Sequence, residues 1–174
     1  MNFLVTGASG FVGRNLFNAF ENHKCVNLAA WDRSKDFCSQ IIAKEGIIHL
    51  AGKAHDLRKT FNPNEYYQAN TVLTQKVFDA FLVSDAKIFI TLSSVKAVAD
   101  SVNLELFEKA IPNPITHYGK SKLLAEQYIL SKPIPKGKRV YILRPCMIHG
   151  SGNKGNLNLL YSLISKGMPW PLGL

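Results

Sequence analysis

The fold is decided by the stretch Thr6-Gly7-Ala8-Ser9-Gly10-Phe11-Val12-Gly13. This stretch follows a short apolar run and precedes an amphipathic segment, so the glycines stand between a predicted strand and a predicted helix. Gly7 permits a tight turn, Gly10 lets the backbone approach a pyrophosphate, and Gly13 lets the helix pack closely on the sheet. The free N–H groups at the start of a helix attract phosphate groups. The stretch therefore predicts a dinucleotide-binding turn, the alternative being a glycine turn with no ligand.

Outward from this turn, short apolar runs rich in branched residues alternate with longer segments of helical pattern. Continuous apolar runs between helices are typical of strands that are buried on both faces, as in a parallel sheet. We therefore predict an α/β fold: a Rossmann-type doubly wound parallel sheet with helices on both faces. The five predicted strands are Phe3–Thr6, Val26–Trp31, Gly46–Ala51, Ile88–Leu92 and Val140–Leu143.

The connection after the second predicted strand is unusually short. Only residues 32–46 separate that strand from Ile47, and one helix over Asp36–Lys44 fills this length. A further strand and helix do not fit there. The third strand that is usual in such folds is therefore expected to be reduced or absent.

Other helices have readable ends. Asn62-Pro63-Asn64-Glu65 supplies an N-cap, a proline at the first helical position and a glutamate at the third, so a helix is predicted from there to about Val83. Two more are predicted over His117–Leu130 and Leu157–Lys166, the last ending before a glycine. The segment Asp100–Pro114 is predicted to be a loop with one short helix.

The composition indicates one domain of ordinary size, because 47% of the 174 residues are apolar and 19% are charged. No apolar run approaches the ~18 residues of a membrane span, and the first residues do not resemble a signal peptide. The three cysteines are scattered, which indicates a reducing cytoplasm and no metal site. The net charge of +9 is also spread along the chain, so we expect a phosphate-bearing ligand rather than a nucleic acid.

The end of the second predicted strand carries Asp32, 25 positions after Gly7. A carboxylate there can accept hydrogen bonds from both ribose hydroxyls of NAD and repels the 2′-phosphate of NADP. Arg33 follows at once and could hold that phosphate, so NAD is favoured and NADP stays open. The alternative for Asp32 is a surface turn. Leu50-Ala51-Gly52 ends the next strand, where small residues leave room for a nucleotide.

A tyrosine and a lysine stand four residues apart in Tyr118-Gly119-Lys120-Ser121-Lys122, on one face of a predicted helix. A nearby cation favours the phenolate and so lowers the pKa of a tyrosine from its usual value of about 10. Ser94 follows the strand Ile88–Leu92, at the edge of a parallel sheet where ligands bind. The alternatives are a pair of surface residues and a simple Ser-Ser turn.

Six motifs occur in order: TGxxGxxG at Thr6–Gly13, His49–Gly52, YxxxN at Tyr66–Asn70, Ser93-Ser94, YxxxK at Tyr118–Lys122, and Leu143-Arg144-Pro145 with His149-Gly150. Together they resemble the extended short-chain dehydrogenase/reductase family, the NAD-dependent epimerases and dehydratases that act on nucleotide sugars. The resemblance covers nearly the whole chain. It implies NAD, or NADP, as the cofactor and a nucleotide sugar as the substrate.

The resemblance implies that Ser94, Tyr118 and Lys122 are catalytic. Tyr118 would be the acid–base group, Ser94 would orient the reacting hydroxyl, and Lys122 would tune Tyr118 and bind ribose. Asn70 would support Lys122 and the cofactor. The complete set of predicted cofactor contacts is Gly7, Ser9, Gly10, Phe11, Val12, Gly13, Asp32, Arg33, Leu50, Ala51, Gly52, Asn70, Lys122 and Pro145, and the predicted substrate contacts are Ser94, Tyr118, Asn156 and Leu157.

The chain also departs from the family. It is shorter than family members, so we expect an N-terminal portion with a nucleotide-binding domain over 1–150 and the incomplete start of a substrate-binding lobe over 151–174. The family's Asp-Leu or Asp-Ile pair that holds the adenine is not found. Sugar dehydratases carry an Asp-Glu pair where this chain has Val95 and Lys96, which argues against a dehydratase. His149 stands where the family often has tyrosine.

Three functional hypotheses follow. The first is an NAD(P)-dependent epimerase of a nucleotide sugar, in which Tyr118 moves a proton while hydride passes to and from the nicotinamide. The second is a nucleotide-sugar dehydrogenase or reductase, and the third is a dinucleotide-binding module without catalysis. The resemblance also implies a homodimer in which each subunit contributes two helices, Asn64–Val83 and His117–Leu130, to a four-helix interface.

Overall fold

The computed structural model describes residues 1–54, 62–102, 105–150, 152 and 156–167. Five strands form one sheet in the order β2-β1-β3-β4-β5, and every neighbouring pair is parallel. The strands are β1 Asn2–Thr6, β2 Asn27–Ala30, β3 Gly46–His49, β4 Ile88–Leu92 and β5 Arg139–Leu143. The predicted parallel α/β sheet is confirmed.

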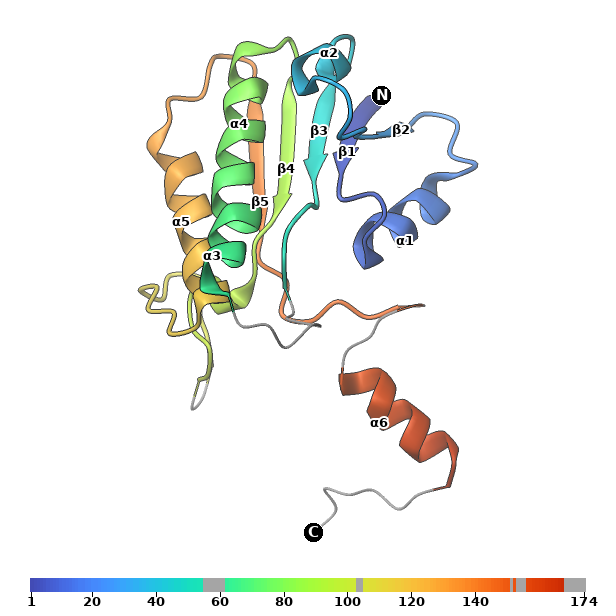
Figure 1. Cartoon of the computed structure of the whole chain (residues 1–174), viewed down its shortest axis with the longest axis vertical. Coiled ribbons are helices and arrows are strands. Elements are labelled where there is room, and N and C mark those ends of the chain that lie inside the picture. Colours follow the sequence, from blue (N-terminus) through green and yellow to red (C-terminus); the bar gives the residue numbers. More distant parts are fainter. Residues whose placement is uncertain (55–61, 103–104, 151, 153–155, 168–174) are drawn as a thin grey trace.

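Helices lie on both faces of this sheet (Figure 1). The helix α1 lies on one face, while α4 and α5 lie side by side on the other. The helical segments are α1 Phe11–Phe20, α2 Phe37–Ile41, α3 Pro63–Tyr66, the π-helical segment η1 Tyr67–Val72, α4 Leu73–Val83, the 3-10 turn η2 Val95–Ala97, α5 His117–Ser131 and α6 Asn156–Ser165. None of the helices in the described ranges is long and apolar enough to cross a bilayer.

The short connection after β2 contains α2 and no strand, so the predicted loss of the usual third strand is confirmed. The side chain of Asp36 accepts a hydrogen bond from the backbone N–H of Ser39 and so caps α2. As a result β2 lies at the edge of the sheet, while β1 pairs with β3 on its other side, with Val5 opposite Ile48. The glycine turn after β1 therefore lies next to the end of β3.

The helix predicted from the Asn62 cap is present, and it runs as α3, η1 and α4 without a break to Val83. The side chain of Asn62 accepts a hydrogen bond from the backbone N–H of Asn64, and Pro63 occupies the first turn. The π-helical segment in its middle was not predicted. The described part of the segment 100–114 contains no helix, so the short helix expected there is not found.

The core lies between the sheet and the layer formed by α4 and α5. Phe78 and Phe81 from α4 pack against Phe89 of β4, with ring centroids 5.1 and 5.3 Å apart, and all three are fully buried. Burial on both faces, which was expected of every strand, holds for β1 and fails for β5. On the second face of β5, Tyr141 and Leu143 are 45% and 48% exposed, because no described element covers them.

Candidate active site

The glycine turn brings the start of α1 against the ends of two strands. Gly7 has a φ of +75°, and a Cβ added there would lie 2.6 Å from the backbone nitrogen of Ala51. A Cβ on Gly13 would lie 2.3 Å from the carbonyl oxygen of Gly7. Only glycine fits these two places without a shift of the backbone. The resulting turn is closed by a hydrogen bond from the Gly10 N–H to the Gly7 carbonyl, 3.0 Å long.

The N-terminus of α1 is left open by this geometry. Gly10 is its N-cap and offers no side chain to the first turn, which also contains no acidic residue. The first N–H groups of a helix have no partner within it and carry the positive end of its dipole. Phe11 and Val12 supply this turn, next to the exposed Ser9. These residues therefore form a cradle suited to an anion such as a pyrophosphate.

A buried polar network fixes the neighbouring strand ends. The ring of His49 is hydrogen-bonded through Nδ1 to Thr6 Oγ1, at 2.7 Å, and through Nε2 to Thr74 Oγ1, at 2.9 Å. Burial and, to a smaller extent, the charge of Lys122 together lower the pKa of His49 to about 3. His49 is therefore a neutral structural residue at ordinary pH. Thr6 Oγ1 also accepts a hydrogen bond from the Ala51 N–H, which holds Leu50–Ala51 beside the glycine turn.

Asn70 ties the loop after β3 to α5. Its side-chain oxygen accepts a hydrogen bond of 2.8 Å from the Lys53 N–H, and its Nδ2 donates to the Lys53 carbonyl and to Ser121 Oγ. The residue lies in η1 and is fully buried. A Cβ on Gly52 would lie 2.7 Å from Asn70 Oδ1 and 3.3 Å from Lys122 Nζ. The structure thus brings Gly52, Asn70 and Lys122 together, as the sequence predicts.

The start of α5 is fixed against the loop that follows β4. The Thr116 hydroxyl accepts a hydrogen bond from the Gly119 N–H, at 3.1 Å, and donates one to Asp100. A Cβ on Gly119 would lie 2.3 Å from the carbonyl oxygen of Lys96, so the helix lies directly on η2. Ser94 caps η2 by accepting from the Lys96 N–H. Tyr118 is consequently held beside Ser94, close enough for the Ser94 side chain to act on the pKa of Tyr118.

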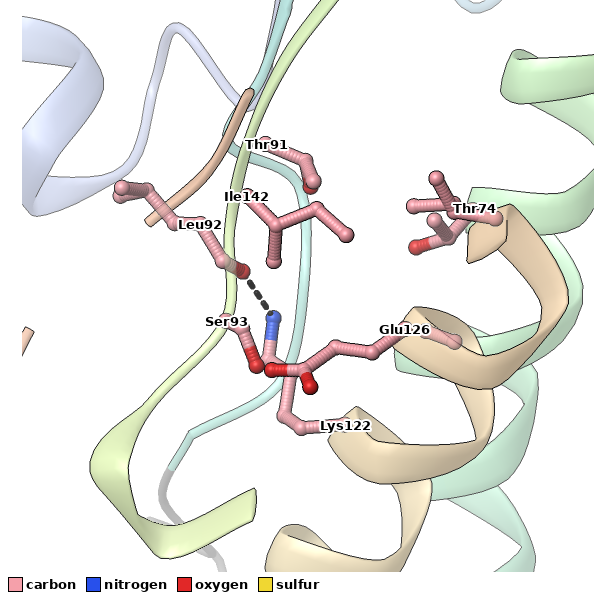
Figure 2. Close-up of a pocket in the computed structure, with 9 residues that line it drawn as sticks. Thr74, Thr91, Leu92, Ser93, Lys122, Glu126 and Ile142 are labelled. Carbon is pink, nitrogen blue, oxygen red and sulfur yellow. Dashed lines mark hydrogen bonds between the residues drawn. The ribbon is translucent and has the colours of Figure 1, made fainter. Parts of the chain in front are cut away.

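The pKa of Tyr118 does not shift in the direction that the sequence predicts. Burial raises the pKa of Tyr118, and this effect outweighs the opposing hydrogen bond with Ser94. Burial also lowers the pKa of Lys122 to about 8, against the opposing charge of Glu126. Nζ of Lys122 donates a hydrogen bond of 2.8 Å to the carbonyl of Leu92 (Figure 2). The expectation that Lys122 lowers the pKa of Tyr118 therefore does not hold here, because the ammonium group is directed at the sheet.

Asp32 already has partners in its own turn. Its carboxylate accepts hydrogen bonds from the Ser34 N–H and hydroxyl, at 2.9 and 2.7 Å, and lies 3.5 Å from Lys35 Nζ. The bonds from Ser34 lower the pKa of Asp32. Arg33 places its guanidinium over the ring of Trp31, 5.6 Å from the centroid. Both residues lie at the end of β2, so the structure leaves the choice between a ribose and a phosphate open.

The structure gives fewer contacts for the other predicted site residues, Pro145, Asn156 and Leu157. The Pro145 carbonyl accepts a hydrogen bond from the Val95 N–H, so the segment after β5 runs beside Ser94. Asn156 and Leu157 begin α6, and their side chains lie outside the described part of the chain. Among the described residues, no group of three or more His, Cys, Asp or Glu side chains could hold a metal ion.

Sequence reasoning missed one buried ion pair. Glu126 has a side chain that is only 3% exposed, and Arg144 donates to both of its oxygens through Nε and Nη2. The sequence signal that could have drawn attention to Glu126 is its spacing, four residues after Lys122 and eight after Tyr118 on the same helix. That spacing places the three on one face of α5.

The parallel sheet and the glycine turn between β1 and α1 define the class: a Rossmann-type nucleotide-binding domain. A second finding narrows the class to a family. The chain belongs to the NAD dependent epimerase/dehydratase family, whose model matches residues 3–168.

Individual relatives include both epimerases and reductases. The chain is 27% identical to UDP-glucose 4-epimerase of Vibrio cholerae, over 99% of this chain and 59% of the relative. It is 28% identical to GDP-6-deoxy-D-mannose reductase of Pseudomonas aeruginosa, over 86% of this chain and 53% of the relative. The chain thus spans little more than half the length of these relatives.

Solved structures agree on the fold. UDP-glucuronic acid 4-epimerase from Bacillus cereus in complex with NAD superimposes with a TM-score of 0.81 at 20% identity, covering 98% of this chain and 64% of that one. RMD from Pseudomonas aeruginosa complexed with NADPH gives a TM-score of 0.73 at 25% identity, covering 95% and 62%.

Proposed function

We propose that this chain is the cofactor-binding and proton-transferring part of an NAD(P)-dependent epimerase of a nucleotide sugar. The observation that carries the proposal is the close packing of the start of α5, with Tyr118, on the turn capped by Ser94, at the same edge of the sheet as the glycine turn. A hydroxyl-bearing substrate that reaches this edge would meet, beside the dinucleotide cradle, a phenol group that could take up the hydroxyl proton as hydride leaves the sugar and return it as hydride comes back. The epimerases among the relatives support the same reaction class.

The residues at the cradle fit NAD or NADP. Gly7 and Gly13 are places where a side chain would collide with backbone, and the uncapped start of α1 suits the pyrophosphate. Asp32 would bind the adenosine ribose, whereas Arg33 would meet the 2′-phosphate of NADP. Bound NAD(P) would supply a nicotinamide that takes a hydride from the sugar and returns it. Pro145 and Gly52 would border that ring.

Each catalytic side chain has one proposed task. Tyr118 moves a proton between its own hydroxyl and a sugar hydroxyl, and Ser94 orients that hydroxyl by a hydrogen bond. Burial keeps Tyr118 protonated, so it can donate at once. To accept a proton it needs a cation nearby, which Lys122 provides when its ammonium group leaves the Leu92 carbonyl. Asn156 and Leu157 are the proposed sugar-nucleotide contacts.

A second candidate is a nucleotide-sugar dehydrogenase or reductase. It uses the same three residues, but the hydride stays on the cofactor or comes from it. The similarity to GDP-6-deoxy-D-mannose reductase, 28% identical, favours this candidate as much as the epimerase match favours the first. A third candidate, a dinucleotide-binding module without catalysis, keeps the cradle and needs no active Tyr118.

The first experiment is a calorimetric titration of the chain with NAD and with NADP, followed by assays with nucleotide sugars. An epimerase converts one sugar into its epimer with no net change in reduced nicotinamide, whereas a dehydrogenase or reductase changes that absorbance. Tyr118→Phe is expected to keep cofactor binding and lose turnover. Tyr128→Phe is the matched control, because Tyr128 lies on the same helix and donates to Asp79. Turnover that survives in Tyr118→Phe contradicts the assignment of Tyr118, and a folded chain that binds neither dinucleotide contradicts the cradle.

The proposal includes a homodimer formed through α4 and α5. Val83 and Leu130, near the ends of these helices, are 86% and 73% exposed, which supports burial against a partner. Leu130→Glu is expected to shift the protein to a monomer in light scattering, and an unchanged mass contradicts this interface. The exposed and unpaired Cys25, Cys38 and Cys146 support the proposal of a reducing, cytoplasmic environment.

A further inference from the structure

A small cavity lies behind Lys122, between α5 and the sheet (Figure 2). It measures about 10 Å³. Nine residues line it: Thr74, Thr91, Leu92, Ser93, Lys122, Ala125, Glu126, Ile129 and Ile142. A polar cavity of roughly 10–15 Å³ holds one water molecule, provided that two to four polar groups can bond to it. An apolar cavity of the same size stays empty.

Ser93 provides the first polar group. Its side chain is buried, with 6% exposure, and its Oγ has no hydrogen-bond partner among the described residues. A buried hydroxyl without a partner costs about 1–3 kcal/mol. Ser93 Oγ lines the cavity, so a water molecule there would remove this cost.

Lys122 and Glu126 provide the charged groups. The described residues give the ammonium group of Lys122 one hydrogen bond, to the Leu92 carbonyl, although it can donate three. The Glu126 carboxylate reaches the same cavity from the next turn of α5. In Figure 2 the Lys122 nitrogen and the oxygens of Ser93 and Glu126 point toward one another. A water molecule among them could accept from the ammonium and donate to the carboxylate.

Arg144 forms an ion pair with Glu126. Its guanidinium donates to both carboxylate oxygens from the loop after β5. Each carboxylate oxygen has further acceptor capacity, so the ion pair leaves room for a third donor. His49 is buried and neutral, and Tyr118 is protonated. Among the described residues, Glu126 on the same helix is therefore the negative charge that acts on Lys122.

We propose that this cavity binds one structural water molecule, bonded to Lys122 Nζ, Ser93 Oγ and the Glu126 carboxylate. Glu126, held by Arg144, thereby acts as a positioning residue for the Lys122 ammonium group. The water site itself does not depend on the proposed function. Only the importance of Lys122 for catalysis rests on that proposal.

The first test is a high-resolution crystal structure of the chain. Electron density for a water molecule within hydrogen-bond distance of Lys122 Nζ and Ser93 Oγ is expected, and an empty cavity overturns the proposal. The second test is an NMR titration of ¹³C-labelled lysine in the free protein, which follows the pKa of Lys122 without any cofactor or sugar. A failed cofactor titration therefore leaves this result unaffected.

Two variants separate positioning from simple packing. In Glu126→Gln the pKa of Lys122 is expected to shift downward, because the carboxylate raises it in the native protein. Ser93→Ala keeps the Glu126–Arg144 pair and the fold, and its crystal structure is expected to lose the water. Asp79→Asn is the control, since Asp79 binds Tyr128 outside the cavity. An unchanged Lys122 titration in Glu126→Gln, or a retained water in Ser93→Ala, contradicts the assignment. If Glu126→Gln does not fold, Ser93→Ala alone decides.

Discussion

The buried lysine predicts how the stability of this protein changes with pH. The pKa of Lys122 is about 8 in the folded state and 10.5 as the ordinary value. Between these two values the unfolded chain binds more protons than the folded one, so stability rises with pH there. The full difference corresponds to about 3 kcal/mol, of which about 2 kcal/mol falls between pH 8 and 10. Well below pH 8 both states are protonated, so the cost of burying the charged Lys122 is present in full and no longer changes with pH.

The assay compares urea denaturation of the native protein and Lys122→Met at several pH values between 6 and 10. The free energy of unfolding of the native protein is expected to rise relative to the variant by about 2 kcal/mol from pH 8 to 10. Lys76→Met, at an exposed position on α4, controls for the loss of one positive charge. Parallel curves for the native protein and Lys122→Met would refute the reasoning, because they would mean that Lys122 is not desolvated by folding.

Three further predictions follow from the geometry. Gly13→Ala places a Cβ 2.3 Å from a backbone oxygen, so the free energy of unfolding measured by thermal denaturation is expected to fall by about 2 kcal/mol or more. An unchanged stability would mean that α1 is free to shift. Arg33→Ala is expected to weaken NADP binding about tenfold and to spare NAD, because it removes one charge-assisted phosphate contact; calorimetry measures both, and equal losses would point to a change in the fold. Arg144→Met leaves the Glu126 carboxylate buried without its partner, so the free energy of unfolding measured in urea is expected to fall by about 3 kcal/mol. The double variant Arg144→Met and Glu126→Leu, which removes the buried charge as well, should recover most of that loss.

Signals that act over a few residues predicted most of the fold. The Asn62 cap and Pro63 fixed the start of a helix because both act within one turn. The five apolar runs became the five strands, and the length of the connection before Ile47 correctly excluded another strand. The exposure of Tyr141 and Leu143 was not predictable, because burial depends on which elements cover the sheet.

The candidate site was predictable only in part. The juxtaposition of Gly52, Asn70 and Lys122 followed from motif positions, and the structure agrees with it. The pKa shifts of Tyr118 and Lys122 could not be predicted from the motifs, because desolvation depends on the surrounding packing. Likewise the pairing of Glu126 with Arg144 joins residues 18 positions apart. The catalytic roles of Ser94, Tyr118 and Lys122 stay predictions.

The π-helical segment has a consequence for how the helix from Pro63 to Val83 tolerates sequence change. A π turn holds one residue more than an α-helical period accounts for, so residues before and after it differ in angular position by about 100° from a regular helix. Asn70 can therefore face the loop after β3 while Phe78 and Phe81 face the core. Deleting the one extra residue within Tyr67–Val72 would restore regular α-helical spacing and leave the two halves facing as they do now. Helical positions that are counted through this segment as if it were a regular α-helix therefore place one of the two halves on the wrong side.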